Sequence, residues 1–251
     1  MELTDVGAFK AFLAEALEKN GMGELASDGA LADGLYRLTV RMLEVNEHMN
    51  LTAIKQPRDI IMRHYVDSLS ASAYIPRGAH VLDVGCGAGF PCLPLALARP
   101  DLHITAVDST EKKVRYVAET AALLGISPDR FAARALRAEE AGAPGGELRE
   151  KFNIVVSRAV AALGVLGELC LPCLSTGGML IALKGDKAAQ EIEQAAGLYV
   201  LGAGSARLVP TPLTWPDDGQ IDRHALVLIE KTAPTPKNFP RKYAQIVKKP
   251  L

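Results

Sequence analysis

The segment 83–90 most limits how this chain can fold, because it places three glycines in a short loop directly after strand-forming residues. Gly85, Gly87 and Gly89 alternate with other residues in this loop. Glycine lacks a Cβ atom, so the backbone can turn sharply here and approach a ligand closely. The sequence predicts a strand over residues 80–84 and a helix over residues 90–99. This order of strand, loop and helix indicates the first half of a βαβ unit.

Short apolar runs alternate with helical patterns as far as residue 232. They predict further strands at 104–107, 131–135, 154–156 and 179–183, and helices at 110–124 and 163–174. Such alternation favours a doubly wound, mostly parallel sheet. The last two apolar runs, 206–209 and 224–229, have no helix between them and should pair antiparallel at one edge, an ending typical of methyltransferases. The expected fold is therefore Rossmann-like α/β with a seven-stranded sheet.

The rest of the chain divides into two further parts. Residues 6–17, 30–45 and 58–74 have the apolar spacing of amphipathic helices, which predicts a small N-terminal helical unit over residues 1–76. Pro-Arg-Gly at 76–78 interrupts this pattern and marks the start of a central domain over residues 77–232. After Glu230 the chain has six basic residues and no acidic one. Residues 233–251 are therefore expected to form a basic C-terminal tail.

Composition and cysteine usage favour a cytoplasmic protein without a membrane span. The chain has 251 residues, 49% of them hydrophobic, which is enough for a sizeable core. No apolar run approaches the roughly 20 residues that cross a bilayer. The four cysteines fall in apolar segments, where reduced, buried thiols are expected. Cys170 and Cys173 form a Cys-x-x-Cys pair without a second ligand pair, so no metal is expected.

The glycine spacing distinguishes between two nucleotide-like ligands. A dinucleotide fingerprint, G-x-G-x-x-G, would need glycine at position 90, where Phe90 stands. S-adenosylmethionine (SAM) has no pyrophosphate to seat on the helix, so a bulky residue can occupy that turn. Its sulfonium cation is also compatible with Asp83 just upstream. The arrangement D-x-G-x-G-x-G resembles the first motif of class I SAM-dependent methyltransferases, although such a loop can also be a purely structural turn.

Asp108 ends the second predicted strand, 19 residues after Gly89. In a doubly wound sheet this position presents a carboxylate to the ribose hydroxyls of a bound nucleoside. The segment 108–110 could also cap the helix that follows, and the two roles are compatible. Residues 137–140 leave the third strand where such folds commonly contact adenine. Taken alone, however, Glu139 is more typical of a surface acid.

The fourth strand ends in Ser157-Arg158-Ala159, where such enzymes hold the groups specific for the methyl acceptor. The Asn- or Asp-Pro-Pro-aromatic turn of amino methylation is absent from this position. C5-pyrimidine methylation needs a thiolate, often in a Pro-Cys pair. Pro91-Cys92 lies instead in the first helix of the domain and is interpreted as packing. Guanine N7 needs neither base nor nucleophile, because its lone pair is unprotonated at neutral pH and alignment suffices.

The chain is similar to the RsmG (GidB) family of bacterial 16S rRNA guanine-N7 methyltransferases over nearly its whole length. The shared motifs lie at residues 50–54, 63–69, 90–91, 107–109, 138–139, 157–159 and 183–185. The resemblance implies a guanosine acceptor in the 530-loop region of 16S rRNA, with the small ribosomal subunit as partner. It also implies cofactor contacts from Gly85, Phe90, Asp108, Ser109, Thr110, Ala138, Glu139 and Arg158.

RNA contacts are expected from basic residues near the site and in the tail, namely Arg63, Lys184, Lys237, Arg241, Lys242, Lys248 and Lys249. The tail departs from the family pattern at Ala244-Gln245-Ile246, which leaves its geometry open. No catalytic residue is assigned, since His64 beside Arg63 and Asp67 is more typical of a structural group. We expect a monomer. Two alternatives are a small-molecule methyltransferase with the N-terminal helices as a lid, and a SAM-sensing module without transferase activity.

Overall fold

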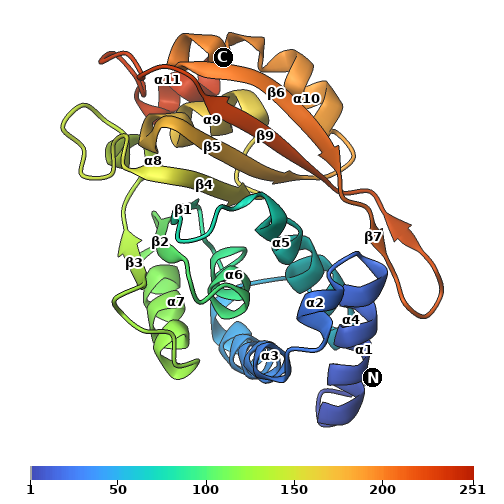
Figure 1. Ribbon diagram of the computed structural model, residues 1–251. Helices are drawn as coiled ribbons and strands as arrows, with labels where there is room; N and C mark the ends of the chain where they lie inside the picture. Colours follow the sequence, from blue (N-terminus) through green and yellow to red (C-terminus); the bar gives the residue numbers. More distant parts are fainter. Residues whose placement is uncertain (1) are drawn as a thin grey trace.

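The computed structural model describes residues 2–251, which form a twisted sheet covered by helices on both faces (Figure 1). At the N-terminus lie α1 (Val6–Lys19), α2 (Gly23–Ala26) and α3 (Gly29–Met49). Asp5 and Asp28 cap α1 and α3, because their carboxylates accept hydrogen bonds from the otherwise unpaired N–H groups of Ala8 and Leu31. The first two predicted helices are therefore confirmed: α1 ends two residues later than predicted, and α3 begins one residue earlier and ends four residues later.

The third predicted helix, residues 58–74, contains a widened turn that periodicity did not indicate. It consists of α4 (Pro57–Ile60), the π-helix η1 (Ile61–Val66), α5 (Asp67–Ser70) and the 3-10 turn η2 (Ser72–Tyr74). A π-turn displaces side chains from the 3.6-residue spacing and is frequent at functional sites. In this chain it carries Arg63 and His64.

The seven-stranded sheet has the order β3-β2-β1-β4-β5-β9-β6. These strands are β1 (His80–Val84), β2 (His103–Asp108), β3 (Phe131–Ala135), β4 (Phe152–Arg158), β5 (Leu174–Lys184), β6 (Ala203–Pro210) and β9 (Ala225–Lys231). The first five are parallel, whereas β9 is antiparallel to both β5 and β6. The predicted fold class, with antiparallel pairing at one edge, is confirmed.

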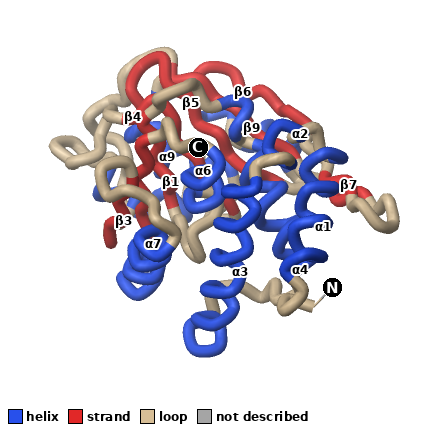
Figure 2. Tube along the Cα trace, turned by 60° about the horizontal axis from the view of Figure 1, so that its bottom comes forward, coloured by secondary structure: helices blue, strands red, loops and turns tan. Residues whose placement is uncertain are grey.

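Between β6 and β9 the chain forms a small hairpin of β7 (Leu213–Thr214) and β8 (Ile221–Asp222). This hairpin lies beside α1, away from the main sheet (Figure 2). The Asn20 side-chain amide donates to the Thr214 carbonyl at 2.9 Å and accepts from the Thr214 N–H at 2.8 Å. The hairpin thereby connects the antiparallel edge of the sheet to the N-terminal helices.

Two hydrophobic clusters cover the two faces of the sheet (Figure 1). On one face α6 (Cys92–Ala98) and α7 (Glu111–Leu123) pack together with the N-terminal helices. The other face is covered by α8 (Ala138–Ala141), α9 (Leu163–Cys170), η3 (Leu171–Cys173), α10 (Ala188–Gln194) and η4 (Ala196–Leu201). The N-terminal helices share a hydrophobic cluster with one face of the sheet, so the core is continuous across residue 76. The domain boundary at that residue stays a prediction.

The C-terminal segment is packed against the domain instead of extending into solvent. The Arg149 guanidinium donates to the carbonyls of Thr235 and Phe239 at 2.6 and 2.8 Å. Farther on, α11 (Tyr243–Lys248) buries Ile246 against α9. Arg241 forms a bidentate ion pair with Glu168, whose side chain is fully buried. The buried carboxylate therefore holds the Arg241 guanidinium, and a contact of Arg241 with RNA stays a prediction.

All four cysteines are buried free thiols, as expected. Within residues 2–251, no helix combines the length and apolar character that a membrane crossing requires.

Candidate functional site

The glycine loop joins β1 to α6 and is held by the end of β2. Its three glycines, Gly85, Gly87 and Gly89, have φ values of 77°, 53° and 92°, a region that favours glycine. The N–H of Gly85 donates to the Val107 carbonyl at 2.8 Å, and the N–H of Gly87 donates to the Asp108 carboxylate at 3.1 Å. The two elements that the sequence predicted as ligand-binding are therefore directly hydrogen-bonded.

Gly85→Ala should lower both stability and SAM affinity, because a Cβ atom at Gly85 would lie 2.4 Å from Val160 Cγ2. Gly145→Ala is the matched control, since Gly145 has the same φ of 77° but nothing within 4 Å of its Cβ position. Both variants should lose about 1–2 kcal/mol of stability from the left-handed backbone. Calorimetric titration with SAM should show weakened binding for Gly85→Ala alone, and equal affinities would contradict a role for this close approach.

Asp83 supports the loop from inside the protein. Its side chain is fully buried, and its carboxylate accepts a hydrogen bond from the Cys92 N–H at 3.1 Å. Burial raises the pKa of this carboxyl to about 7. Asp83 does not line the cavity described below. The structure therefore does not support the direct contact with a sulfonium that its position in the sequence suggested.

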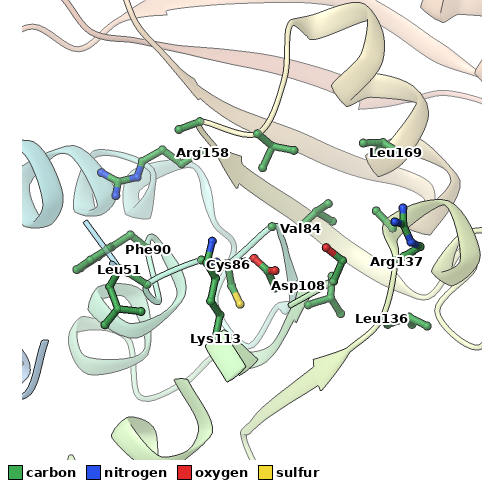
Figure 3. Close-up of a pocket in the computed structure, with 18 of the residues that line it drawn as sticks. Leu51, Val84, Cys86, Phe90, Asp108, Lys113, Leu136, Arg137, Arg158 and Leu169 are labelled. Carbon is green, nitrogen blue, oxygen red and sulfur yellow. Dashed lines mark hydrogen bonds between the residues drawn. The ribbon is translucent and has the colours of Figure 1, made fainter. Parts of the chain in front are cut away.

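A cavity of about 630 Å³ opens at the carboxyl ends of β1, β2, β3 and β4, where doubly wound sheets bind their ligands (Figure 3). Seven of the eight predicted cofactor contacts line it, namely Gly85, Phe90, Asp108, Ser109, Ala138, Glu139 and Arg158. The eighth, Thr110, is the N-cap residue of α7, and its N–H donates to Asp108 Oδ1 at 2.8 Å. The cavity brings together residues from four strand ends that lie far apart in sequence.

Both roles considered for Asp108 are compatible with its environment. One carboxylate oxygen accepts from the Thr110 N–H and the other from the Gly87 N–H. A carboxylate offers about four lone-pair positions, so each oxygen can also accept from a ligand hydroxyl. Asp108 is half-buried at the cavity wall, as Figure 3 shows. This arrangement fits a nucleoside ribose and organises the glycine loop at the same time.

An aromatic and cationic cluster closes one end of the cavity. The rings of His64 and Phe90 stack with centroids 4.3 Å apart, and the Arg158 guanidinium lies 5.1 Å from the Phe90 centroid. Arg158 also donates to His64 Nδ1 at 3.0 Å and to the Arg63 carbonyl at 2.7 Å. His64 Nε2 lies 3.1 Å from Thr52 Oγ1. Both nitrogens of His64 are therefore engaged.

His64 should make stability depend on pH in the acidic range. Burial first, and then the Arg158 charge, lower its pKa from 6.5 to about 3. The unfolded chain therefore takes up a proton as the pH falls through 6.5, while the folded chain does not. Stability should fall by about 1.4 kcal/mol between pH 7.5 and pH 5.5 from this group. Urea unfolding of His64→Gln should lack this component, whereas the exposed-site control His48→Gln should retain it. Identical pH dependence in both variants would contradict the assignment.

A second cavity, of about 620 Å³, lies next to the first, beyond the end of β4. The two cavities share His64, Arg158, Ala159 and Val160, which form what we call the junction. Asp67, Lys184, Glu191 and His224 line only the second cavity. A group bound in one cavity can therefore meet a group bound in the other only across the junction.

Two basic residues predicted to touch RNA line this second cavity, but both are engaged by acidic partners. Lys184 Nζ donates to Glu191 at 2.7 Å and to the Ala161 carbonyl at 2.6 Å. Arg63 pairs with Asp222 at 3.1 Å, although its side chain is 42% exposed. Lys184 is consequently held inside the protein, whereas Arg63 keeps an accessible face. The lysines of the C-terminal segment, Lys237, Lys242, Lys248 and Lys249, are exposed.

Several lining residues had no assigned role in the sequence analysis. Lys113 and Tyr243 border the first cavity, and His224 borders the second. Tyr243 belongs to the C-terminal segment, which composition described only as basic. His224 directly precedes β9 without any recognisable motif around it. Helices α1–α3 supply no lining residue to either cavity, whereas the third helical stretch of the N-terminal unit lines them through Arg63, His64 and Asp67.

Comparisons with known proteins agree with this geometry. The family model of GidB, rRNA small subunit methyltransferase G, matches residues 33–211. A ribosomal RNA small subunit methyltransferase G from Deinococcus radiodurans is 40% identical over 94% of this chain and 92% of that protein. A protein of the same description from Limosilactobacillus fermentum is 38% identical over 94% and 96%.

Among solved structures, a SAM-dependent O-methyltransferase from Thermotoga maritima superposes with a TM-score of 0.50 at 12% identity. The match covers 78% of this chain and 72% of that one, and at this identity it supports the fold alone. The family match, by contrast, spans more than half of the chain and includes the glycine loop, Asp108 and the junction. This chain therefore belongs to the GidB family of rRNA small subunit methyltransferase G, a family of SAM-dependent enzymes.

Proposed function

We propose that this protein methylates N7 of a guanine in the 530-loop region of 16S rRNA. The observation that carries the proposal is the chemistry of the junction, where the polar side chains are already engaged with one another. An acceptor that must lose a proton, such as an amino group or a hydroxyl, would need a free base there. Guanine N7 presents an unprotonated lone pair and needs only alignment with the methyl group.

The groups near the junction support this choice of acceptor. His64 Nδ1 accepts from the Arg158 guanidinium, so its lone pair is unavailable to a substrate proton. The two oxygens of Asp67 are bonded to Arg158 and His224, at 3.2 and 3.1 Å. Burial raises the pKa of the Cys92 thiol, which opposes the thiolate that C5-pyrimidine methylation uses. None of these three groups supplies a free base at the junction, whereas His224 Nε2 lies in the second cavity, outside the junction. A transfer at the junction that requires only positioning is consistent with this arrangement.

The first cavity is suited to the cofactor. SAM supplies an electrophilic methyl group on its sulfonium sulfur. Asp108 is placed to accept from the ribose hydroxyls, while Ala138 and Glu139 border the region proposed for adenine. Gly85 lies so close to Val160 that a side chain at position 85 would collide with it. Arg158, held by His64 and Asp67, orients the end of the cavity nearest the acceptor.

Incubation with methyl-labelled SAM and small ribosomal subunits lacking the N7 methyl group tests the proposal. Label should appear in 16S rRNA as 7-methylguanosine, in one fragment containing the 530 loop. Label in a different base, or in small molecules of a cell extract, would refute it. The same preparation should sediment as a monomer, and a cytoplasmic location follows from the substrate.

Substituting Lys248 and Lys249 together by glutamine should weaken binding to the subunit and reduce its salt dependence. Both side chains are exposed and adjoin α11, which borders the cofactor cavity through Tyr243. Each lost phosphate contact should lower the slope of log K against log salt by about 0.7. Filter binding at several salt concentrations measures this slope. Lys151→Gln, an exposed change beside the start of β4 at the opposite end of the sheet, should leave it unchanged.

A further inference from the structure

The second cavity has a specific pattern of hydrogen-bonding groups that the proposed function does not explain. Its polar lining residues are Arg63, His64, Asp67, Arg158, Lys184, Glu191 and His224. Most of their polar atoms pair with one another, as described above. Within residues 2–251, two acceptor atoms of this set have no hydrogen-bond partner: His224 Nε2 and Glu191 Oε1.

The protonation of His224 follows from its neighbour. Nδ1 lies 3.1 Å from Asp67 Oδ1, and the Asp67 side chain is only 5% exposed. A carboxylate can only accept, so Nδ1 carries the hydrogen. In the neutral imidazole, Nε2 then has a free lone pair. His224 itself is 25% exposed and borders the cavity, so a ligand can reach this lone pair.

Glu191 is oriented in a comparable way. Its Oε2 accepts from Lys184 Nζ at 2.7 Å and from the Leu163 N–H at 2.8 Å. Two donors therefore hold one oxygen and leave Oε1 as the second acceptor. Glu191 also forms an ion pair with Lys184, whose side chain is 9% exposed. The second cavity thus combines an imidazole acceptor with a carboxylate acceptor.

We infer that the second cavity binds the acceptor guanine and that His224 and Glu191 accept hydrogen bonds from its N1–H and N2–H groups. This inference rests on the proposed function, since it assumes transfer to guanine N7. With N7 at the junction, the Watson–Crick edge of the base faces the interior of the second cavity. Guanine presents two adjacent donors on that edge, whereas adenine N1 is an acceptor and would face acceptors. The site therefore selects guanine as well as positioning it.

Two variants test the inference with isolated enzyme, labelled SAM and unmethylated small subunits. In Glu191→Gln the amide oxygen must take the place of Oε2, because Lys184 and Leu163 both donate there. The NH₂ group then replaces Oε1 and presents a donor to guanine without a change in volume. Transfer at saturating subunit should fall roughly 10- to 100-fold, the range for a hydrogen bond to a charged group. His224→Leu should lose roughly 10-fold.

Matched controls separate positioning from structural damage. Glu193→Gln makes the same charge change at an exposed position of α10, and His103→Leu changes an exposed histidine at the amino end of β2. Both should retain wild-type transfer. In Glu191→Gln and His224→Leu, the SAM dissociation constant should stay unchanged. The melting temperature should fall, because Lys184 loses its counter-charge and Asp67 loses a donor, so transfer is measured at a temperature at which circular dichroism shows every variant to be folded. The Michaelis constant for the subunit should also stay near wild type, because phosphate contacts dominate subunit binding.

Contrary outcomes are distinguishable. Unchanged transfer in both variants would overturn the inference. Weakened SAM binding in parallel with lost transfer would also overturn it, since the residues would then act through Arg158 and the cofactor cavity. A higher Michaelis constant with unchanged turnover would indicate backbone contact and would overturn it as well. Failure of the wild-type enzyme to form 7-methylguanosine refutes the proposed function by itself and is seen without the variants.

Discussion

Arg241→Met is expected to lower the free energy of unfolding by about 3–5 kcal/mol, the usual cost of leaving one partner of a buried ion pair without its counter-charge. Glu168 is fully buried and receives hydrogen bonds from the Arg241 guanidinium at 2.9, 3.1 and 2.5 Å. Without Arg241 this carboxylate would have to be protonated or left unpaired inside the protein. Urea unfolding followed by circular dichroism measures the loss.

Two further variants show whether the ion pair itself is responsible. Lys242→Met makes the same change at the next, exposed position and should cost less than about 0.5 kcal/mol. The double variant Glu168→Leu with Arg241→Met removes both charges and should recover most of the stability. A single-variant loss below about 1 kcal/mol would show that the C-terminal segment is not anchored through this pair.

Asp108→Ala is expected to weaken SAM binding by about 1–3 kcal/mol, because hydrogen bonds to a charged group are lost. The carboxylate is proposed to accept from the ribose, and it also holds the Gly87 and Thr110 N–H groups. Calorimetric titration with SAM measures the change. Asp129→Ala, at an exposed turn before β3, serves as the control and should bind like wild type.

An unchanged dissociation constant for Asp108→Ala would refute the ribose contact. A partial loss in Asp108→Asn would separate its two roles. The amide oxygen can still accept from one backbone N–H, but the NH₂ group cannot accept from the other. The asparagine variant should therefore lose loop support at one of the two N–H groups, and its affinity should lie between wild type and Asp108→Ala.

The sequence predicted the sheet and most of the cofactor cavity because their signals are local. A run of strand-forming residues, a glycine loop and an acidic residue after the next strand can each be recognised from a few neighbouring residues in the sequence. The parallel sheet then brings the strand ends to one edge without further information. Gly85 and Asp108 line the cavity for this reason, whereas the complete set of eight contacts, seven of which line it, came from the resemblance to the family. Thr110 lies outside it because its backbone turns into α7.

The ion pairs of the basic residues could not be predicted, because charge in a sequence does not indicate what a side chain pairs with. Arg241 and Lys184 were expected to face RNA. Arg241 pairs with Glu168, which is distant in sequence, and Lys184 pairs with Glu191 on the following helix. The tail was described by its charge alone, although Ile246 and Tyr243 decide its position. The π-turn at residues 61–66 was also outside the reach of periodicity, since that pattern assumes 3.6 residues per turn.

The glycine segment 83–90, the alternation of strands and helices along the chain and the family-specific motifs determine the fold class and the kind of cofactor from the sequence alone. Only the tertiary structure brings together Asp67, Glu191 and His224, which come from α5, α10 and the residue before β9. Their roles depend on which atoms the surrounding protein leaves without a hydrogen bond. That property arises from packing between distant segments, and no local pattern of residues encodes it.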